Sequence, residues 1–405
     1  MRQDILNGIR FADFTWAGAG PFSTKIFSDF GAEVIKIESA TRPDSVRTGG
    51  PFAGGVPGID RSGYFASRNT GKKSITVNLK SDEGKEIVRE LIARSDVVSN
   101  NFGPGAMERL GFSYEEVRRI RPDVVYLGMP MYGDDGPRAE LLGVGMTISA
   151  VTGLMWQTSY EDGRPIGPGT HYPDHAANPY HAAFAVMAAL RHRRRTGEGM
   201  KIDLAQVEST INMIGPSFVE YSGTGVEPAI TGNRSRWHAP HDVFRCRGDD
   251  RWCAITVMTD AQWPALCGVL GLDTLAAEPA LATAAGRVAD VERIGAAIAA
   301  KAAERDPVEL AAALQRAGVP ASPVQSAREL MDTDPQLRAR GYWQRIDHPE
   351  MGETGFTSPP YRFDGGRVEL ARPPLLGEHT ESVLRDTLGY PAERIAALRE
   401  AGVLQ

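Results

Sequence analysis

The chain has 405 residues, a formal net charge of −6, 42% hydrophobic residues and 24% charged residues, which predicts a globular protein of more than one domain. The acidic balance argues against nucleic acid or an anionic membrane as a partner. No apolar run approaches the length of a membrane span, and the first residues lack the hydrophobic core of a signal peptide, so we expect a cytoplasmic protein.

The first 130 residues predict alternating strands and helices. Ser81 is typical of a helix N-cap, because apolar residues at helical spacing follow it. Strands rich in Val and Ile that alternate with helices favour a parallel sheet covered on both faces. We therefore predict an α/β fold with a Rossmann-like sheet in a large domain at residues 1–205. The expected strands are 9–14, 32–38, 74–79, 96–101 and 123–129, and the expected helices are 21–30, 82–95 and 114–120.

Residues 18–38, GAGPFSTKIFSDFGAEVIKIE, combine a glycine loop with a helix start. Gly18 and Gly20 precede the helix, and Pro21 suits its first turn. Ser23 stands where a dinucleotide fingerprint would have its third glycine, so the pattern does not predict NAD. A glycine loop at a helix N-terminus still binds a phosphate or a similar anion. We expect a nucleotide-bearing ligand at this end of the sheet.

Residues 169–190, GTHYPDHAANPYHAAFAVMAAL, place a carboxylate at a junction. The glycine-rich segment 132–170 upstream has no helical period, whereas residues 176–190 downstream predict a buried helix. Asp174 at this junction would face the positive end of the helix dipole, which favours its ionised form. Two interpretations follow from this position: Asp174 caps the helix, or it acts as a nucleophile.

Three histidines, His171, His175 and His181, surround Asp174 in the sequence. Their intervals of four and six residues lack the intervening glutamate of a zinc-binding helix, so we predict no metal site. His171 or His175 could orient the carboxylate or move a proton, and the sequence leaves these roles open.

The composition changes after about residue 223 and predicts a smaller α+β domain at residues 225–325. A hairpin is expected at 242–258 and alanine-rich helices at 260–317. The prolines of 318–324 predict an edge strand, because proline has no N–H to donate to a neighbouring strand. Three cysteines fit neither a metal pair nor a disulfide framework, so we predict reduced thiols. They are Cys246, Cys253 and Cys267.

The segments 206–224 and 326–374 are expected to be linkers. The tail combines a proline-rich stretch at 371–376 with a predicted helix at 392–401. We expect residues 375–405 to rejoin the large domain.

Several segments, in this order along the chain, resemble the class III CoA-transferases. This family contains the formyl-CoA, carnitine and benzylsuccinate CoA-transferases and the related α-methylacyl-CoA racemases. The segments span most of the chain, so the resemblance does not depend on one short motif. They are residues 19–38, 69–80, 96–117, 133–140, 151–177, 195–209 and 373–390.

The resemblance implies an enzyme that transfers CoA from an acyl-CoA to a small free carboxylic acid. It implies Asp174 as the nucleophile, an aspartyl anhydride and an aspartyl-CoA thioester as intermediates, and no metal or NAD. The family fold implies an interlocked homodimer. The CoA contacts that the resemblance implies are Gly18 and Ala19 at the adenosine end, Asn69, Thr70, Gly71, Lys72, Asn101, Phe102, Gly103 and Arg109.

Two departures from the family pattern narrow the expected activity. The racemases use a His of a Tyr/His-Asp pair as acid and base, but Val144 and Gly145 stand in that place. Formyl-CoA transferases carry a tetraglycine loop, and this chain has only SGTG at 222–225. The alternatives that stay open are an acyl-CoA racemase or isomerase and a CoA-binding protein without chemistry. An NAD oxidoreductase ranks last.

Overall fold

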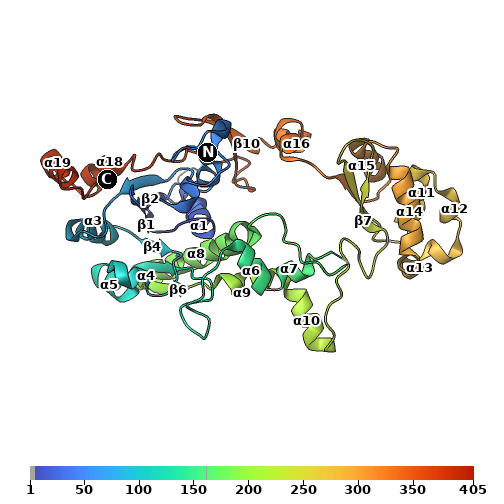
Figure 1. The fold of residues 1–405 in the computed structure, drawn as a ribbon, viewed down its shortest axis with the longest axis horizontal. Helices are drawn as coiled ribbons and strands as arrows, with labels where there is room; N and C mark the ends of the chain where they lie inside the picture. The colour runs from blue at the N-terminus through green and yellow to red at the C-terminus, as the bar shows by residue number, and fades with distance from the viewer. Residues whose placement is uncertain (1–4, 161) are drawn as a thin grey trace. The chain divides into compact units, whose positions relative to one another are not determined.

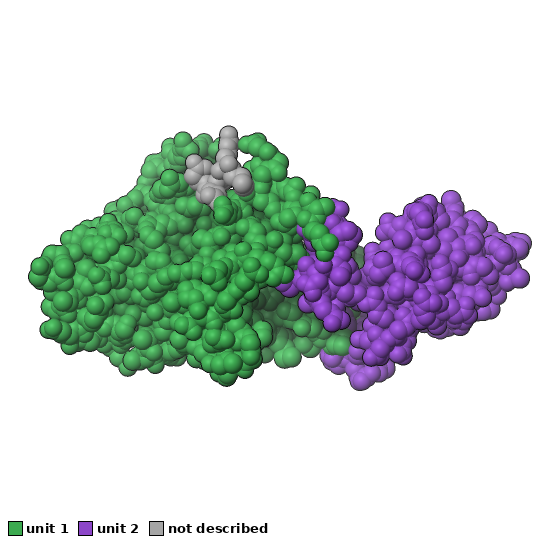
Figure 2. Space-filling model, turned by 90° about the horizontal axis from the view of Figure 1, so that it is seen from above, with its two compact units in different colours: residues 1–157, 166–227, 338–405 green, residues 158–165, 228–337 purple. Residues whose placement is uncertain are grey.

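The computed structural model describes residues 5–160 and 162–405 and divides the chain into two compact units, coloured separately in Figure 2. The larger unit comprises Met1–Gln157, Ile166–Glu227 and Arg338–Gln405, and the smaller one comprises Thr158–Pro165 and Pro228–Leu337.

A six-stranded parallel sheet forms the centre of the larger unit, which confirms the predicted α/β class (Figure 1). Its strand order is β3-β2-β1-β4-β5-β6, and every pairing is parallel. The order reverses between β1 and β4, and ligands of open α/β sheets bind beyond the carboxyl ends of the strands at such a point. The strands are β1 (Arg10–Asp13), β2 (Glu33–Glu38), β3 (Lys73–Thr76), β4 (Val97–Asn100), β5 (Val125–Gly128) and β6 (Met200–Asp203).

Helices cover both faces of this sheet because side chains alternate along each strand. On one face, Phe11 of β1 packs in a core with residues of α1 (Ala19–Ser28) and α8 (Asn178–Thr196). On the other face, Ala12 packs in a core with residues of α3 (Asp82–Ala93) and α5 (Tyr114–Ile120). Ser81 caps α3 through a hydrogen bond from Gly84 N, as its position predicted.

The C-terminal tail returns to the sheet beside β3 in the larger unit. Its elements are α18 (Thr380–Ser382), a π turn at Val383–Thr387 and α19 (Ala392–Glu400). Asn78 N donates to Val403 O at 2.9 Å, and His379 N donates to Ser74 O at 2.9 Å. Val383, Leu384 and Leu404 join the core that contains α3.

Several helices and strands lie where the sequence suggested loops or linkers. The segment 206–224 contains α9 (Gln206–Ile211) and α10 (Gly215–Thr224). The segment 326–374 contains an antiparallel pair, β10 (Trp343–His348) and β11 (Gly352–Thr357), and Phe356 of β11 packs with Phe30. The glycine-rich region contains α6 (Gly145–Val151) and α7 (Leu154–Gln157). These elements are too short or too rich in glycine to show a clear hydrophobic period.

The smaller unit joins a three-stranded antiparallel sheet to helices. Its strand order is β7-β8-β9, so the proline-containing β9 lies at an edge as predicted. All three cysteines are free and buried, as predicted. The elements are β7 (His241–Arg245), β8 (Trp252–Thr256), β9 (Ala321–Pro323), α11 (Gln262–Leu270), α12 (Asp273–Ala276), α13 (Ala284–Ala289), α14 (Val291–Ala302), α15 (Pro307–Arg316) and α16 (Ala327–Asp332).

Candidate active site

Asp174 lies in a π turn, Pro173–Ala177, that runs directly into α8. Its backbone N donates to His171 O at 2.9 Å, and the N-cap residue of the turn is Tyr172, whose side chain makes no capping hydrogen bond. The helix has Ala177 at the N-cap position and begins at Asn178, so the interpretation of Asp174 as an N-cap is wrong. A π turn of this kind is often found at functional sites, because it turns a side chain out of the regular helical position.

Two glycines leave room for the Asp174 carboxylate. A Cβ atom added at Gly18 would lie 2.6 Å from Oδ2 of Asp174, and one added at Gly145 would lie 3.1 Å from the same oxygen. Gly18 is the residue before α1, and Gly145 is the first residue of α6. The carboxylate therefore lies against backbone on two sides, and Asp174 is only 8% exposed.

The loop of residues 15–18, which brings Gly18 to Asp174, is held at successive residues. Asn101 accepts a hydrogen bond from Trp16 N and donates one to Trp16 O, both at 2.8 Å. Asp44 accepts from Ala17 N at 3.0 Å. Ala17 has φ 60°, a left-handed conformation that a non-glycine residue adopts only when its surroundings enforce it. This loop is thus fixed by the fold before any ligand binds.

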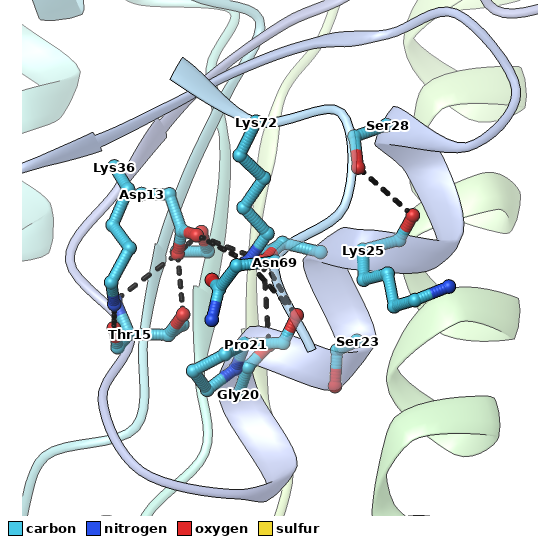
Figure 3. A network of polar contacts seen from close by, with 12 residues as sticks. Asp13, Thr15, Gly20, Pro21, Ser23, Lys25, Ser28, Lys36, Asn69 and Lys72 are labelled. Carbon is cyan, nitrogen blue, oxygen red and sulfur yellow. Dashed lines mark hydrogen bonds and ion pairs between the residues drawn. The ribbon is translucent and has the colours of Figure 1, made fainter. Parts of the chain in front are cut away.

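A buried ionic network underlies the same loop, as Figure 3 shows. Asp13 accepts from Thr15 N at 3.1 Å and lies 3.2 Å from the ammonium group of Lys72. Lys36 donates to Thr15 O and pairs with Asp44 at 3.0 Å. Burial by itself raises the pKa of Asp13, but Lys72 and Lys36 outweigh it and hold that pKa below its usual value. Asp13 therefore stays ionised between the two ammonium groups.

Aromatic and basic side chains surround Asp174 on the side of α2 (Gly63–Ala66). Arg68 lies over the Tyr64 ring, with 3.6 Å between its guanidinium carbon and the ring centroid. The Tyr64 ring also contacts the rings of His171 and His175, at centroid distances of 6.4 and 6.3 Å. Arg68 is buried, at 8% exposure, and both histidines are half-buried.

Burial raises the pKa of Asp174 to about 6, against the smaller opposing effects of His171 and Arg68. The carboxylate is thus ionised at neutral pH. Burial nevertheless disfavours the ionised form, which opposes the stabilisation by the helix dipole that the sequence predicts. Burial and the charge of Arg68 lower the pKa of His175 to about 4, so this imidazole is neutral at pH 7.

A cavity of 760 Å³ opens beyond the carboxyl ends of the parallel strands. Trp16 lines this cavity, and Gly18, two residues later, touches Asp174. Arg42, Lys80 and Arg109 supply three cationic side chains to its lining, and Phe102 supplies an aromatic one.

The predicted contact residues fall into three places. Phe102 and Arg109 line the large cavity, and Phe102 and Gly103 line a neighbouring one of 390 Å³. Asn101 holds Trp16, and Gly18 and Ala19 lie at the Asp174 end of the loop and not among the residues lining the large cavity.

The side chains of residues 69–72 do not line these cavities. Asn69, Thr70 and Lys72 are at most 3% exposed. Lys72 donates to Pro21 O at 2.9 Å, and Thr70 donates to Asp29 at 2.6 Å. Internal partners therefore hold the Thr70 and Lys72 side chains, whereas Asn69 Oδ1 has no hydrogen-bond partner among the described residues, and CoA contacts at residues 69–72 stay a prediction.

Gly145 lies against Asp174, and Tyr64 and Arg68 interact with it electrostatically, although the sequence does not predict a role for any of the three. Tyr64 and Arg68 stand among small and polar residues with no periodic pattern. Gly145 was noted only as a departure from the racemase pattern. Among the described residues, no group of three or more His, Cys, Asp or Glu side chains could hold a metal ion. The same residues contain no helix long and apolar enough to cross a membrane.

The parallel α/β sheet, the cavity beyond its strand ends and the buried carboxylate against the loop that follows β1 are features of an enzyme-like site of the nucleotide-binding α/β class. The sequence model of CoA-transferase family III matches residues 6–380. The chain therefore belongs to CoA-transferase family III, an enzyme class whose substrates are CoA thioesters.

Curated relatives match over nearly the whole chain. A succinyl-CoA:glutarate CoA-transferase of Mus musculus is 32% identical over 99% of this chain and 90% of its own length. A formyl-CoA:oxalate CoA-transferase of Streptomyces coelicolor is 32% identical over 100% of both chains.

Solved structures share the fold. A CAIB/BAIF family protein from Brucella suis matches with a TM-score of 0.85 and 30% identity, over 94% of this chain and 99% of that chain. Rv3272 from M. tuberculosis matches with a TM-score of 0.77 and 26% identity, over 93% of this chain and 98% of that chain.

Replacing Gly18 by Ala is expected to lower CoA-transferase activity by about 100-fold, because the new Cβ would displace the Asp174 carboxylate. The backbone at Gly18 has φ −97°, which alanine tolerates, so the fold should persist. The control is Gly295→Ala in α14, where an added Cβ meets no atom within 4 Å. Rate measurements and circular dichroism on both variants test this, and full activity of Gly18→Ala would contradict the close packing.

The raised pKa of Asp174 predicts a pH-dependent cost to folding. The folded protein binds the proton more tightly than the unfolded chain, so this contribution to stability is lost as pH rises from the unfolded value of 3.8 through about 6. At neutral pH, Asp174→Asn should therefore be more stable than the natural protein by about 1–3 kcal/mol. Urea unfolding of both proteins across this pH range measures the difference, and a pH-independent difference would contradict the shift.

Proposed function

We propose that this protein transfers CoA from an acyl-CoA thioester to a free carboxylic acid, with Asp174 as the covalent nucleophile. The observation that supports this most directly is the buried Asp174 carboxylate, which lies against Gly18 and Gly145. The loop that carries Gly18 also lines the large cavity through Trp16. A thioester carbonyl presented beside this loop would meet a nucleophile shielded from water, and shielding protects an anhydride from hydrolysis.

The proposed cycle keeps one negative charge at every stage, on a carboxylate in the free enzyme and in the aspartyl-CoA state and on the CoA thiolate in the anhydride states. An oxygen of Asp174 attacks the acyl carbonyl and expels CoA thiolate, which leaves a mixed anhydride. The thiolate then attacks the aspartyl carbonyl and releases the donor acid as a carboxylate, which leaves an aspartyl-CoA thioester. The acceptor carboxylate then attacks the aspartyl-CoA carbonyl and expels CoA thiolate, which leaves a second mixed anhydride. The thiolate attacks the acceptor's acyl carbonyl in this anhydride, which releases the new acyl-CoA and regenerates the Asp174 carboxylate.

Backbone groups are proposed to stabilise the oxyanions of these steps. Gly18 immediately precedes α1, so the positive end of that helix dipole faces Asp174. Preorganised N–H groups in a site that excludes water stabilise developing negative charge more strongly than they would in water. The fixed loop of residues 15–18 would provide them without reorganisation.

The CoA moiety is proposed to occupy the large cavity. Arg109, Arg42 and Lys80 would neutralise its phosphates, and Phe102 and Trp16 offer aromatic surface to the adenine. We propose that Gly18 and Ala19 belong to the reacting end of the ligand instead of the adenosine end. Residues 69–72 would support CoA transfer indirectly, because Lys72 belongs to the buried ionic network that fixes the loop of residues 15–18.

The names of the relatives suggest the first substrates to test. Two relatives are named for succinyl-CoA with glutarate and for formyl-CoA with oxalate. We propose an acid of this small carboxylic class as acceptor and begin with succinyl-CoA and glutarate. Gly145 offers no side chain for the proton transfer that a racemase needs, so the transferase hypothesis is preferred.

The Asp174→Asn and Asp174→Ala variants should bind CoA but transfer none of it, because neither side chain can form the anhydride. Intact-mass spectrometry of the natural protein incubated with succinyl-CoA should show an adduct of one CoA, and both variants should lack it. The control is Asp82→Asn, which changes an exposed carboxylate in the first turn of α3. Near-normal turnover of Asp174→Ala would overturn the mechanism. Exchange of the acyl α-hydrogen with solvent deuterium, without an acceptor acid, would indicate a racemase.

We propose a homodimer, interlocked as the family resemblance implies. In the larger unit, α10 has no buried residue, and its Phe218, Val219 and Tyr221 are 45%, 73% and 53% exposed. Phe184 on α8 is 77% exposed. Exposed apolar side chains of this size are typical of a surface that another chain covers.

Light scattering after size-exclusion chromatography should give twice the chain mass for the natural protein. Val219→Asp should give monomers or aggregates, because it would bury an unpaired charge in the interface. The control is Val308→Asp, at an exposed position of α15 in the other unit, which should leave the mass unchanged. A monomeric natural protein with full activity would contradict the dimer.

A further inference from the structure

Arg68 is a buried cation whose hydrogen bonds are incomplete. Its Nη1 donates to Tyr64 O at 3.0 Å and to Ser67 Oγ at 2.9 Å. Its Nη2 lies 2.8 and 2.9 Å from the two ring nitrogens of His175. Its Nε is buried and has no hydrogen-bond partner among the described residues. The donors on the Nε/Nη2 edge of this guanidinium therefore meet no oxygen in the described part of the chain.

Arg68 differs from the other buried cations in the described part of the chain, because each of the others pairs with a carboxylate. No ion pair within 4.0 Å involves Arg68 there. The paired cations are Lys25 with Asp29, Lys36 with Asp44, Arg47 with Glu38, Lys72 with Asp13 and Arg287 with Asp260. A buried charge without a partner is strongly destabilising, so it marks a place where an anion binds or a function requires the charge.

The carboxylate that acts on Arg68 electrostatically is Asp174. The charge of Arg68 lowers the pKa of Asp174, and Asp174 raises that of Arg68, although burial is the larger effect on both groups. His175 is neutral at pH 7 and adds no charge. In the free protein, Arg68 and Asp174 thus compensate each other at a distance beyond direct pairing.

This compensation ends when Asp174 reacts. In the proposed cycle, Asp174 is uncharged in both the anhydride and the aspartyl-CoA thioester. The negative charge that Asp174 loses passes to the CoA thiolate in the anhydride and to the free acid at the aspartyl-CoA stage, first the departing donor acid and then the acceptor. At the aspartyl-CoA stage, Arg68 would be an uncompensated buried charge unless the free acid took the place of Asp174 as its anion.

We propose that Arg68 binds the carboxylate of the free acid and holds it beside the aspartyl-CoA thioester, an inference that rests on the proposed function. The Nε–H and one Nη2–H of a guanidinium point to the same side and match the two oxygens of a carboxylate. Stacking on Tyr64 fixes the guanidinium plane. The acid is thereby recognised through its reacting carboxylate, whatever its remaining chain.

The test compares Arg68→Met and Arg68→Lys with the natural protein, using succinyl-CoA and glutarate or a faster pair from the same acid panel. Arg68→Met should raise KM for the acid by about 10- to 100-fold and change KM for the acyl-CoA little, because a charge-assisted hydrogen bond is lost only toward the acid. Arg68→Lys keeps the charge without the paired donors and should fall between the two. The control is Arg89→Gln, at a surface ion pair of α3.

Two readouts separate this role from a structural one. Arg68→Met should accumulate the CoA adduct from succinyl-CoA but discharge it slowly when glutarate is added. As the pH is lowered, its activity should also be lost at a higher pH than that of the natural protein. Removal of Arg68 raises the pKa of Asp174, so the nucleophile is protonated earlier. If Arg68→Met does not fold, the KM of Arg68→Lys for the acid decides the question.

The outcomes distinguish the two proposals. If the natural protein forms no CoA adduct and Asp174→Ala retains turnover, the proposed function fails. If the adduct forms in the natural protein but neither Arg68 variant changes KM for the acid or the rate of discharge, the role of Arg68 is wrong and the proposed function stands. Equal increases in the KM values for acid and acyl-CoA would also overturn the role of Arg68, because they would indicate a general distortion of the site.

Discussion

The site depends on the buried carboxylate of Asp13, which holds three parts of the fold together at the end of β1. It accepts hydrogen bonds from Thr15 in the following loop and from Thr24 on α1, and it pairs with Lys72. Lys36 extends the network to Asp44, which in turn holds Ala17. Removing one member of a buried ion pair leaves an uncompensated charge and is strongly destabilising, so each of these groups depends on the others. The loop that reaches Asp174 therefore has one stable position.

A fixed loop matters because the chemistry proposed for Asp174 requires closeness that side chains would prevent. Gly18 and Gly145 let backbone approach the carboxylate, and the left-handed Ala17 shows that the surrounding bonds hold the chain against a local preference. The same enclosure removes water from Asp174 and raises its pKa to about 6. Burial of the ionised Asp174 thus lowers the folding stability at neutral pH, at the place where a nucleophile shielded from water is useful. Such a loss of stability is common in active sites.

Arg68 extends this reasoning from the nucleophile to the acid. Five other buried cations have carboxylate partners within the fold, whereas Arg68 meets the edge of an imidazole and a distant Asp174. A reaction that moves one carboxylate back and forth between enzyme and substrate suits such a cation. The charge balance of the site would then stay constant through the cycle, although the group that carries the negative charge changes.

The sequence by itself determined the alternation of strands and helices, the α/β class and the position of Asp174 ahead of α8, because hydrophobic period and punctuation by glycine and proline are local properties. It also placed β9 at an edge and left the three cysteines unpaired. Only the tertiary structure decided that Lys72 and Thr70 turn inward, that Gly18 meets Asp174 and that Arg68 Nε finds no hydrogen-bond partner among residues 5–160 and 162–405. These facts depend on contacts between residues far apart in the chain, such as Asp13 with Lys72, and no local pattern records which side chains such contacts will use or leave free.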